Sequence, residues 1–185
     1  MTFAERVVGA LKLDANTFED IERDPTAMGQ AVAIIALSAL ASNLGQIWRL
    51  GFGAMLIGVC SSLVGYVLWA VVVWLAGTKL MPDPATKADF PETFRTIAFA
   101  ASPGLIGVVT IVPLLGWLLM IVLFPIIWVW SMAAMVVAVR QVLDYSETFK
   151  AVIVVLIGFV VFLVFWMTME FLSFGAAVVG GMFGR

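Results

Sequence analysis

The sequence predicts an all-α fold: a polytopic membrane helical bundle with five transmembrane helices, the N-terminus cytoplasmic and the C-terminus outside. Four stretches carry no charged side chain, namely those between Asp24 and Arg49, from Leu50 to Thr78, from Thr96 to Val139 and from Ala151 to Met169. Each approaches or exceeds the roughly 20 apolar residues that cross a hydrocarbon core about 30 Å thick. The third is about twice that length and is interrupted by Pro113 and Gly116, so it predicts two crossings.

The composition excludes several classes of function. With 63% hydrophobic residues the chain is not a soluble domain, and a net charge of −2 gives no basic surface for nucleic acid. Histidine is absent, which removes imidazole from any proton relay, catalytic triad or metal site. The single cysteine, Cys60, lies inside an apolar stretch, so no intramolecular disulfide is possible.

Residues 1–27 are predicted as a cytoplasmic interfacial segment that precedes a transmembrane domain of residues 28–185. Phe3, Val7 and Leu11 share one helical face, which predicts a short helix lying on the membrane surface. The charged residues Glu5, Arg6 and Lys12 fall on its other face. Asn16 with Glu19 resembles a capping box and predicts a second short helix over Thr17–Arg23.

The five crossings are predicted at Met28–Trp48, Ala54–Thr78, Thr96–Val112, Leu114–Val139 and Lys150–Ser173. Lys79–Arg95 is the largest polar loop, and the shared face of Phe90, Phe94 and Ile97 predicts that its second half lies along the membrane interface. Ser146 is the expected cap of the last crossing. Residues 174–185 are expected to continue crossing five, to lie flat on the outer face or to enter a neighbouring protomer.

Lysine and arginine set the predicted orientation. One side of a five-crossing bundle carries eight of them: Arg6, Lys12, Arg23, Lys79, Lys87, Arg95, Arg140 and Lys150. The other side carries only Arg49 and Arg185. This asymmetry predicts that the N-terminus faces the cytoplasm of a multi-pass protein in the cell membrane, which is the cytoplasmic membrane in a prokaryote.

Three segments carry a family resemblance: Asn16–Pro25, Phe94–Pro103, and Val139–Gln141 followed by Thr148–Ala151. Together with the order of short N-terminal segment, five crossings and short outer turns, they resemble the Yip1 domain family. The N-terminal segment has only about 27 residues, and Phe99 stands where the family often has tyrosine, so the chain is similar to a compact prokaryotic member. The resemblance implies a role in organising membranes, without the Rab-linked trafficking of eukaryotic members.

Glu170 is the candidate intramembrane acid, because a carboxylate within a span is costly and marks a functional site by default. Three interpretations stay open for it: a protonation switch within the span, a water-exposed position near the outer headgroups, and an ion pair with Arg49.

Other candidates each have two interpretations. Pro103, Gly104 and Pro125 indicate helices broken for gating and transport, or packing alone. The small residues Ala54, Gly58, Ser62 and Gly65 predict close helix packing, within the chain or between copies. Arg95, Arg140 and Lys150 are candidate cytoplasmic contacts to headgroups or to a partner.

The sequence offers no nucleophile–base pair, no phosphate-binding glycine motif and no metal-spaced ligands, so we expect no catalytic residue, metal or cofactor.

The favoured function is a non-enzymatic membrane protein that organises lipids or partner membrane proteins; expected partners are lipids, a second copy or another membrane protein, and not nucleic acid. The alternative is a small transporter, channel or lipid scramblase that uses broken crossings three and four with Glu170. Convergence of the polar residues of the spans on one cavity would favour this alternative; they are Ser38, Ser42, Asn43, Gln46, Ser61, Ser62, Thr110, Ser131 and Glu170.

Overall fold

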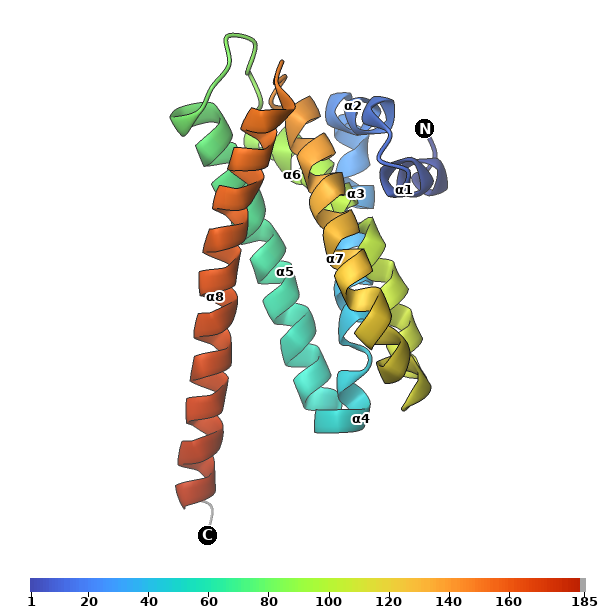
Figure 1. Ribbon diagram of the computed structural model, residues 1–185, viewed down its shortest axis with the longest axis vertical. Coiled ribbons are helices and arrows are strands. Elements are labelled where there is room, and N and C mark those ends of the chain that lie inside the picture. The colour runs from blue at the N-terminus through green and yellow to red at the C-terminus, as the bar shows by residue number, and fades with distance from the viewer. Residues whose placement is uncertain (184–185) are drawn as a thin grey trace.

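The computed structural model describes residues 1–183, with the side chains of residues 1–169 and of Phe171. All secondary structure in this part of the chain is helical (Figure 1). The elements are α1 (Phe3–Leu11), α2 (Ala15–Arg23), η1 (Pro25–Ala27), α3 (Met28–Asn43), α4 (Gln46–Leu50), α5 (Phe52–Leu75), the π-helix η2 (Ala76–Leu80), α6 (Phe90–Ala100), the 3-10 helix η3 (Ser102–Ile111), α7 (Leu115–Val142) and α8 (Thr148–Phe183).

Four helical segments are long and apolar enough to cross a membrane: Pro25–Asn43, Phe52–Leu80, Leu115–Val142 and Thr148–Met169. α6 and η3 together pass the same test but are bent by 44° where they meet, which is the geometry of a broken span or of a re-entrant loop. The predicted all-α membrane bundle is therefore confirmed, with five spans when the bent pair counts as one.

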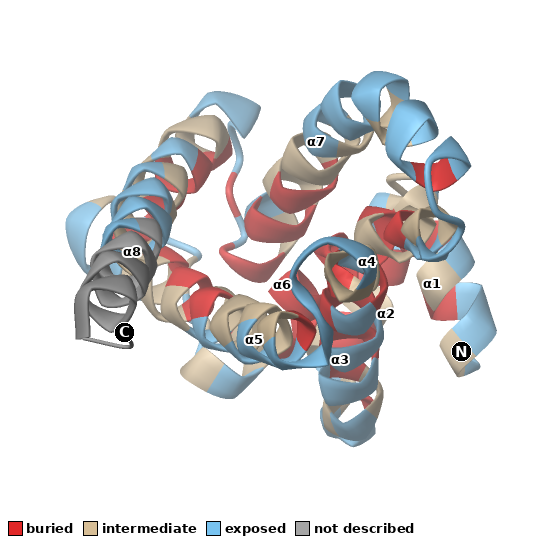
Figure 2. Ribbon diagram, turned by 90° about the horizontal axis from the view of Figure 1, so that it is seen from below, coloured by how far each residue is buried: buried red, intermediate tan, exposed pale blue. Residues whose placement is uncertain are grey.

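The bundle is closed at one end and splayed at the other. α1, α2 and the α5–α6 and α7–α8 connections gather at what we call the N-terminal end, and α4 with the η3–α7 turn marks the α4 end (Figure 1). α8 packs on α5 and α7, but α7 and α8 separate toward the α4 end, as the two views show (Figures 1 and 2). Buried residues gather where α3, α5, α6 and α7 face one another (Figure 2).

Crossing one is shorter than predicted, because α3 ends at Asn43 and the chain turns into α4. Gly45 permits this turn to lie directly on η3, since an added Cβ there would come within 2.9 Å of the Thr110 Cβ. Trp48 Nε1 then donates to the carbonyl of Ile111 at 2.9 Å and fixes α4 across η3. Gly51, with φ of +88°, ends α4 in a conformation that favours glycine.

Crossing three begins earlier than predicted, at Phe90 rather than Thr96. Asp89 and Glu92 form a capping box, in which Glu92 N donates to Asp89 Oδ1 at 2.7 Å and Asp89 N to Glu92 Oε2 at 3.0 Å. The Phe90 ring packs edge-on against Trp74 with centroids 6.1 Å apart. Phe90 and Phe94 are half-buried against the core of the bundle, and the position of this stretch along the membrane interface stays a prediction.

The two proline-containing spans behave differently. α6 and η3 bend at Ala101, just before Pro103, whose ring removes a backbone donor. α7 runs unbroken from Leu115 to Val142 with Pro125 inside it. The prediction of a break in crossing four is therefore wrong, since membrane helices tolerate an internal proline.

The N-terminal helices also differ from expectation in detail. Asp14, not Asn16, caps α2, because its carboxylate accepts from Asn16 N at 3.2 Å and from the Thr17 hydroxyl at 2.8 Å. α1 keeps its predicted apolar face, with Phe3 against Phe99. Arg6, expected on the solvent face, is instead 1% exposed and bonded to α2 and its neighbours.

Candidate functional site

Three neighbouring hollows run along the splayed half of the bundle, and we call them together the central groove. The rim hollow at the α4 end has about 790 Å³, the side hollow between α5 and α8 about 300 Å³, and the inner hollow about 200 Å³. They share lining residues: Gln46 and Trp166 join rim and side hollows, Ser42 and Phe124 join rim and inner hollows, and Phe162 joins side and inner hollows.

Seven of the nine polar residues named in the sequence analysis line this groove. Those that do so are Ser42, Asn43, Gln46, Ser61, Ser62, Thr110 and Ser131. Ser38, also named there, does not line it, because it is fully buried, and its hydroxyl has no hydrogen-bond partner. Other polar side chains nearer the N-terminal end, such as Thr96 and Ser102, also lie outside the groove. The side chain of Glu170 lies outside the described part, so its three interpretations stay open.

Hydrogen bonds fix several of these groups to the walls. Asn43 Nδ2 donates to the Ala39 carbonyl at 2.8 Å and to Ser62 Oγ at 3.1 Å, and Asn43 Oδ1 accepts from Gln46 Nε2 at 2.6 Å. The Ser42 hydroxyl donates to the Gly104 carbonyl at 3.2 Å. The groove therefore has a hydrogen-bonded polar seam within walls that are mainly aromatic and aliphatic.

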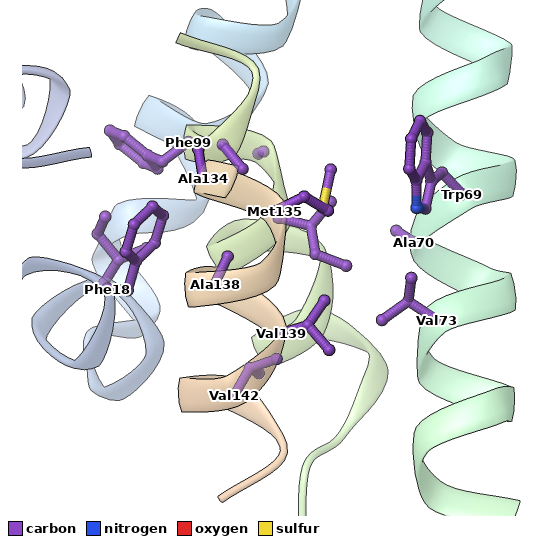
Figure 3. Close-up of a cluster of buried hydrophobic side chains, with 14 of the residues drawn as sticks. Phe18, Trp69, Ala70, Val73, Phe99, Ala134, Met135, Ala138, Val139 and Val142 are labelled. Carbon is purple, nitrogen blue, oxygen red and sulfur yellow. The ribbon is translucent and has the colours of Figure 1, made fainter. Parts of the chain in front are cut away.

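The groove is closed toward the N-terminal end by the hydrophobic core. Met135 and Val139 of α7 face Trp69 and Val73 of α5, all of them at most 5% exposed (Figure 3). Met135 and Trp69 also form the floor of the inner hollow. A molecule in the groove thus has access from the α4 end and from the side, but meets packed side chains in the N-terminal half.

The predicted gating residues lie beside this groove. Gly104 lines the inner hollow, and an added Cβ there would sit 3.3 Å from the Ser38 Cβ, so the residue also allows η3 to approach α3 closely. Pro103 is buried at the start of η3. Pro125 is exposed and follows Phe124, whose ring lines the groove.

The small residues of α5 contact two different helices. Gly58 and Ser62 face α3, where a Cβ on Gly58 would come 2.2 Å from Asn43 Oδ1. Gly65 faces α8, where a Cβ would come 2.7 Å from the Phe162 ring. Ala54 lines the side hollow. In this structure the stripe thus supports contacts within the chain.

The three predicted cationic contacts have different surroundings. Arg95 is 5% exposed, and its Nε donates to the carbonyls of Ile21 at 3.0 Å and Glu22 at 2.9 Å at the end of α2. A cation suits the carbonyl end of a helix dipole, so Arg95 anchors α2 inside the protein. Lys150 pairs with Asp83, and Arg140 is exposed. A headgroup or partner contact stays a prediction that the geometry favours most for Arg140.

A polar clasp at the N-terminal end was missed from the sequence. Asp83 is 8% exposed, and its carboxylate accepts from the Ser146 hydroxyl at 3.1 Å and from the Lys150 ammonium. The Ser146 hydroxyl, expected to cap the last crossing, is therefore bonded to Asp83, and α8 begins two residues later at Thr148. The Tyr145 hydroxyl lies 2.8 Å from the Met81 carbonyl, just past the π-helix η2. The prolines on both sides of Asp83 indicate an ordered loop. They do not show that Asp83 pairs with Lys150, which lies 67 residues along the chain.

A second feature missed from the sequence is the environment of Glu22. It lines a hollow of about 360 Å³ at the N-terminal end with Glu19, Arg140 and Asp144. Burial, and then the nearby carboxylates of Asp144 and Glu92, raise the pKa of Glu22 to about 7. The folded carboxyl therefore binds its proton more tightly than the unfolded one, whose pKa is 4.5.

Glu22→Gln is expected to raise the free energy of unfolding by about 1–2 kcal/mol near pH 8 and to change it little near pH 4.5. The wild-type contribution is full below the unfolded pKa of 4.5 and is lost as the pH rises through about 7, because the charged carboxylate is then buried among like charges. Unfolding measured at both pH values checks this. An equal effect at both would contradict it.

No three histidine, cysteine, aspartate or glutamate residues are grouped as metal ligands within the described part of the chain. No curated protein and no solved structure matches the sequence. The Yip1 domain family does match it, over residues 9–169. This range begins in α1 and ends within α8, so it includes every residue that lines the central groove.

Proposed function

Because the chain belongs to the Yip1 domain family and has helices fit to cross a membrane, we propose that it is a non-enzymatic protein that organises the lipids of the cytoplasmic membrane by holding them in the central groove. The observation that carries this proposal is the convergence of seven polar side chains, six from α3, α5, η3 and α7 and one from α4, on one mainly apolar groove. Helix packing alone does not require these groups to share a surface.

The chemistry of the walls fits a lipid better than a hydrated ion. The inner hollow is lined by Phe124, Trp128, Phe159 and Phe162, which suit acyl chains. An ion would need a continuous polar or charged lining through the membrane. The polar seam instead ends at the packed core, at Met135. This supports a site that holds a lipid from one leaflet rather than a path that runs through the bilayer.

Lipid translocation remains the second candidate, and it is favoured by the same convergence of polar groups. It needs the core between α5 and α7 to open, since the groove closes there in this conformation. The two functions therefore differ in one measurable result, which is movement of lipid between leaflets.

Filling the inner hollow tests the proposed function. We expect Ser131→Trp to reduce the lipid that stays bound during purification by about tenfold, which corresponds to roughly 1.4 kcal/mol of binding free energy. The matched control is Val129→Trp, which places the same side chain on the outer face of α7, where Val129 is 61% exposed. Bound lipid per protein is measured by mass spectrometry, on variants whose thermal unfolding matches wild type.

The same proteins in liposomes separate the two candidates. Holding predicts that fluorescent lipids do not exchange between leaflets faster than in empty liposomes. Exchange that is abolished by Ser131→Trp and unaffected by Val129→Trp would replace holding with translocation. Equal lipid retention by both variants would contradict a role of the groove in either function.

A further inference from the structure

We infer that the lipid in the central groove is a diacyl phospholipid, with its phosphodiester against the Arg49 guanidinium and its acyl chains in the rim and inner hollows. This inference rests on the proposed function. It adds the class of lipid, the side chain that recognises its headgroup, and its orientation, with the headgroup at the α4 end and the acyl chains toward the core.

Among the side chains that the structure describes, Arg49 is the charged one that lines the mouth of the groove. It is exposed on α4 and lines the rim hollow beside Gln46. The other Lys and Arg residues of the described chain lie on or next to α1 and α2, on η2 and the loop after it, on α6 where it contacts α2, or beside the α7–α8 connection, and these segments meet at the N-terminal end (Figure 1). A guanidinium presents several N–H donors in a planar fork that matches two phosphate oxygens at once.

The position of Arg49 is set by the fold rather than by a free loop. Trp48, the preceding residue, holds α4 on η3 through its 2.9 Å bond to the Ile111 carbonyl, and Gly51 ends the helix after one turn. Arg49 therefore stays at the rim, and Gln46, one turn earlier on α4, leads into the side hollow. Less side-chain and backbone freedom is lost on binding when the helix that carries the cation is already fixed.

From the rim to the inner hollow the lining changes from polar to apolar, as a phospholipid does from its headgroup to its acyl chains. Arg49 shares the rim hollow with the indoles of Trp48, Trp117 and Trp166, side chains that prefer the boundary between headgroups and hydrocarbon. Phe124 then connects the rim to the inner hollow. A free phosphate ion leaves the aromatic walls uncovered, and a neutral lipid offers the guanidinium no phosphate, so a phospholipid satisfies both parts.

The experiment compares lipids with matched acyl chains. Purified protein is offered phosphatidylglycerol, phosphatidylcholine or diacylglycerol in detergent, and retained lipid is measured by native mass spectrometry. We expect the two phospholipids to be retained about tenfold better than diacylglycerol, and Arg49→Gln to remove this preference. Arg49→Lys, which keeps the charge but not the fork, is expected to restore it only in part. Arg23→Gln, which removes an exposed charge at the other end, is the control.

Each outcome bears on a different statement. Equal retention of diacylglycerol and phospholipids, or unchanged retention in Arg49→Gln while Ser131→Trp loses lipid, would overturn the role of Arg49 and leave the lipid-holding groove. Displacement of bound phospholipid by millimolar inorganic phosphate would identify a phosphate site that does not need the chains, and would overturn the inference. No retention of any lipid by wild type would refute the proposed function as well.

Discussion

Replacement of Arg6 by alanine is expected to lower the free energy of unfolding by about 2–4 kcal/mol, because it removes three hydrogen bonds of a buried cation. Arg6 Nε lies 2.9 Å from Asp20 Oδ2, Nη1 lies 3.0 Å from Gln30 Oε1, and Nη2 lies 2.5 Å from Asp24 Oδ2. Contacts from Thr26 and then from Arg6 lower the pKa of Asp24 to about 2, so this carboxylate is charged at neutral pH. Without Arg6 the two carboxylates lose the cation that bridges them, and within the described chain only the N-terminal ammonium, 3.7 Å from Asp20 Oδ2, remains close to Asp20.

The loss is expected first in the N-terminal helices, which Arg6 ties to α3 through Gln30. Hydrogen exchange of the backbone amides of α1 and α2 should accelerate well before the spans are affected. The control is Arg23→Ala, because Arg23 is 74% exposed and pairs with Glu19 within one helix turn, a contact worth about 0.3–0.5 kcal/mol. Similar losses for both variants would show that the burial of Arg6 is not what matters.

The contrast between these two arginines also marks what sequence reasoning can reach. Hydropathy and length identified the spans, since a charge-free apolar stretch of about 20 residues has few alternatives to a membrane helix. The sequence-based prediction placed Arg6 on the face away from Phe3 and Val7 and assumed that this side meets water. In the structure Arg6 is on the buried side of α1 with Gly9 and Ala10, because positions three residues apart, such as Phe3 and Arg6, are neighbours on a helix. The partners of Arg6 lie 14 to 24 residues away, and no local pattern shows that they converge.

The candidate site divides in the same way. The polar residues of the spans were identified individually, but their convergence depends on the rotation and register of each helix, which the single sequence does not fix. Pro103 correctly predicted the bend of crossing three. Pro125 did not predict the unbroken helix around it. A proline in the sequence does not show whether neighbouring groups bond the backbone atoms that it leaves without a partner. Nothing in the local sequence around Asp83 distinguishes it from other loop carboxylates, because its partner Ser146 lies 63 residues along the chain.

Gly107→Val is expected to cost about 3 kcal/mol of stability, at the upper end of the usual range for overpacking. Gly107 of η3 lies against the backbone of α3: an added Cβ would come 2.8 Å from Ser42 Cα and 3.0 Å from the Ala41 carbonyl oxygen. Backbone atoms cannot rotate away as a flexible side chain can, so η3 must move off α3. Because Ser42 and Thr110 line the groove on either side of this contact, bound lipid should fall together with stability.

Gly29→Val is the matched control, because Gly29 is exposed on α3 and an added Cβ there has no atom within 4 Å. The change is expected to alter stability by no more than about 0.5 kcal/mol, since valine is at least as good as glycine in a helix. Unfolding of both variants in mixed micelles with increasing denaturing detergent measures the difference. A small cost for Gly107→Val would mean that η3 and α3 separate easily, and that this wall of the groove is mobile rather than fixed by backbone contact.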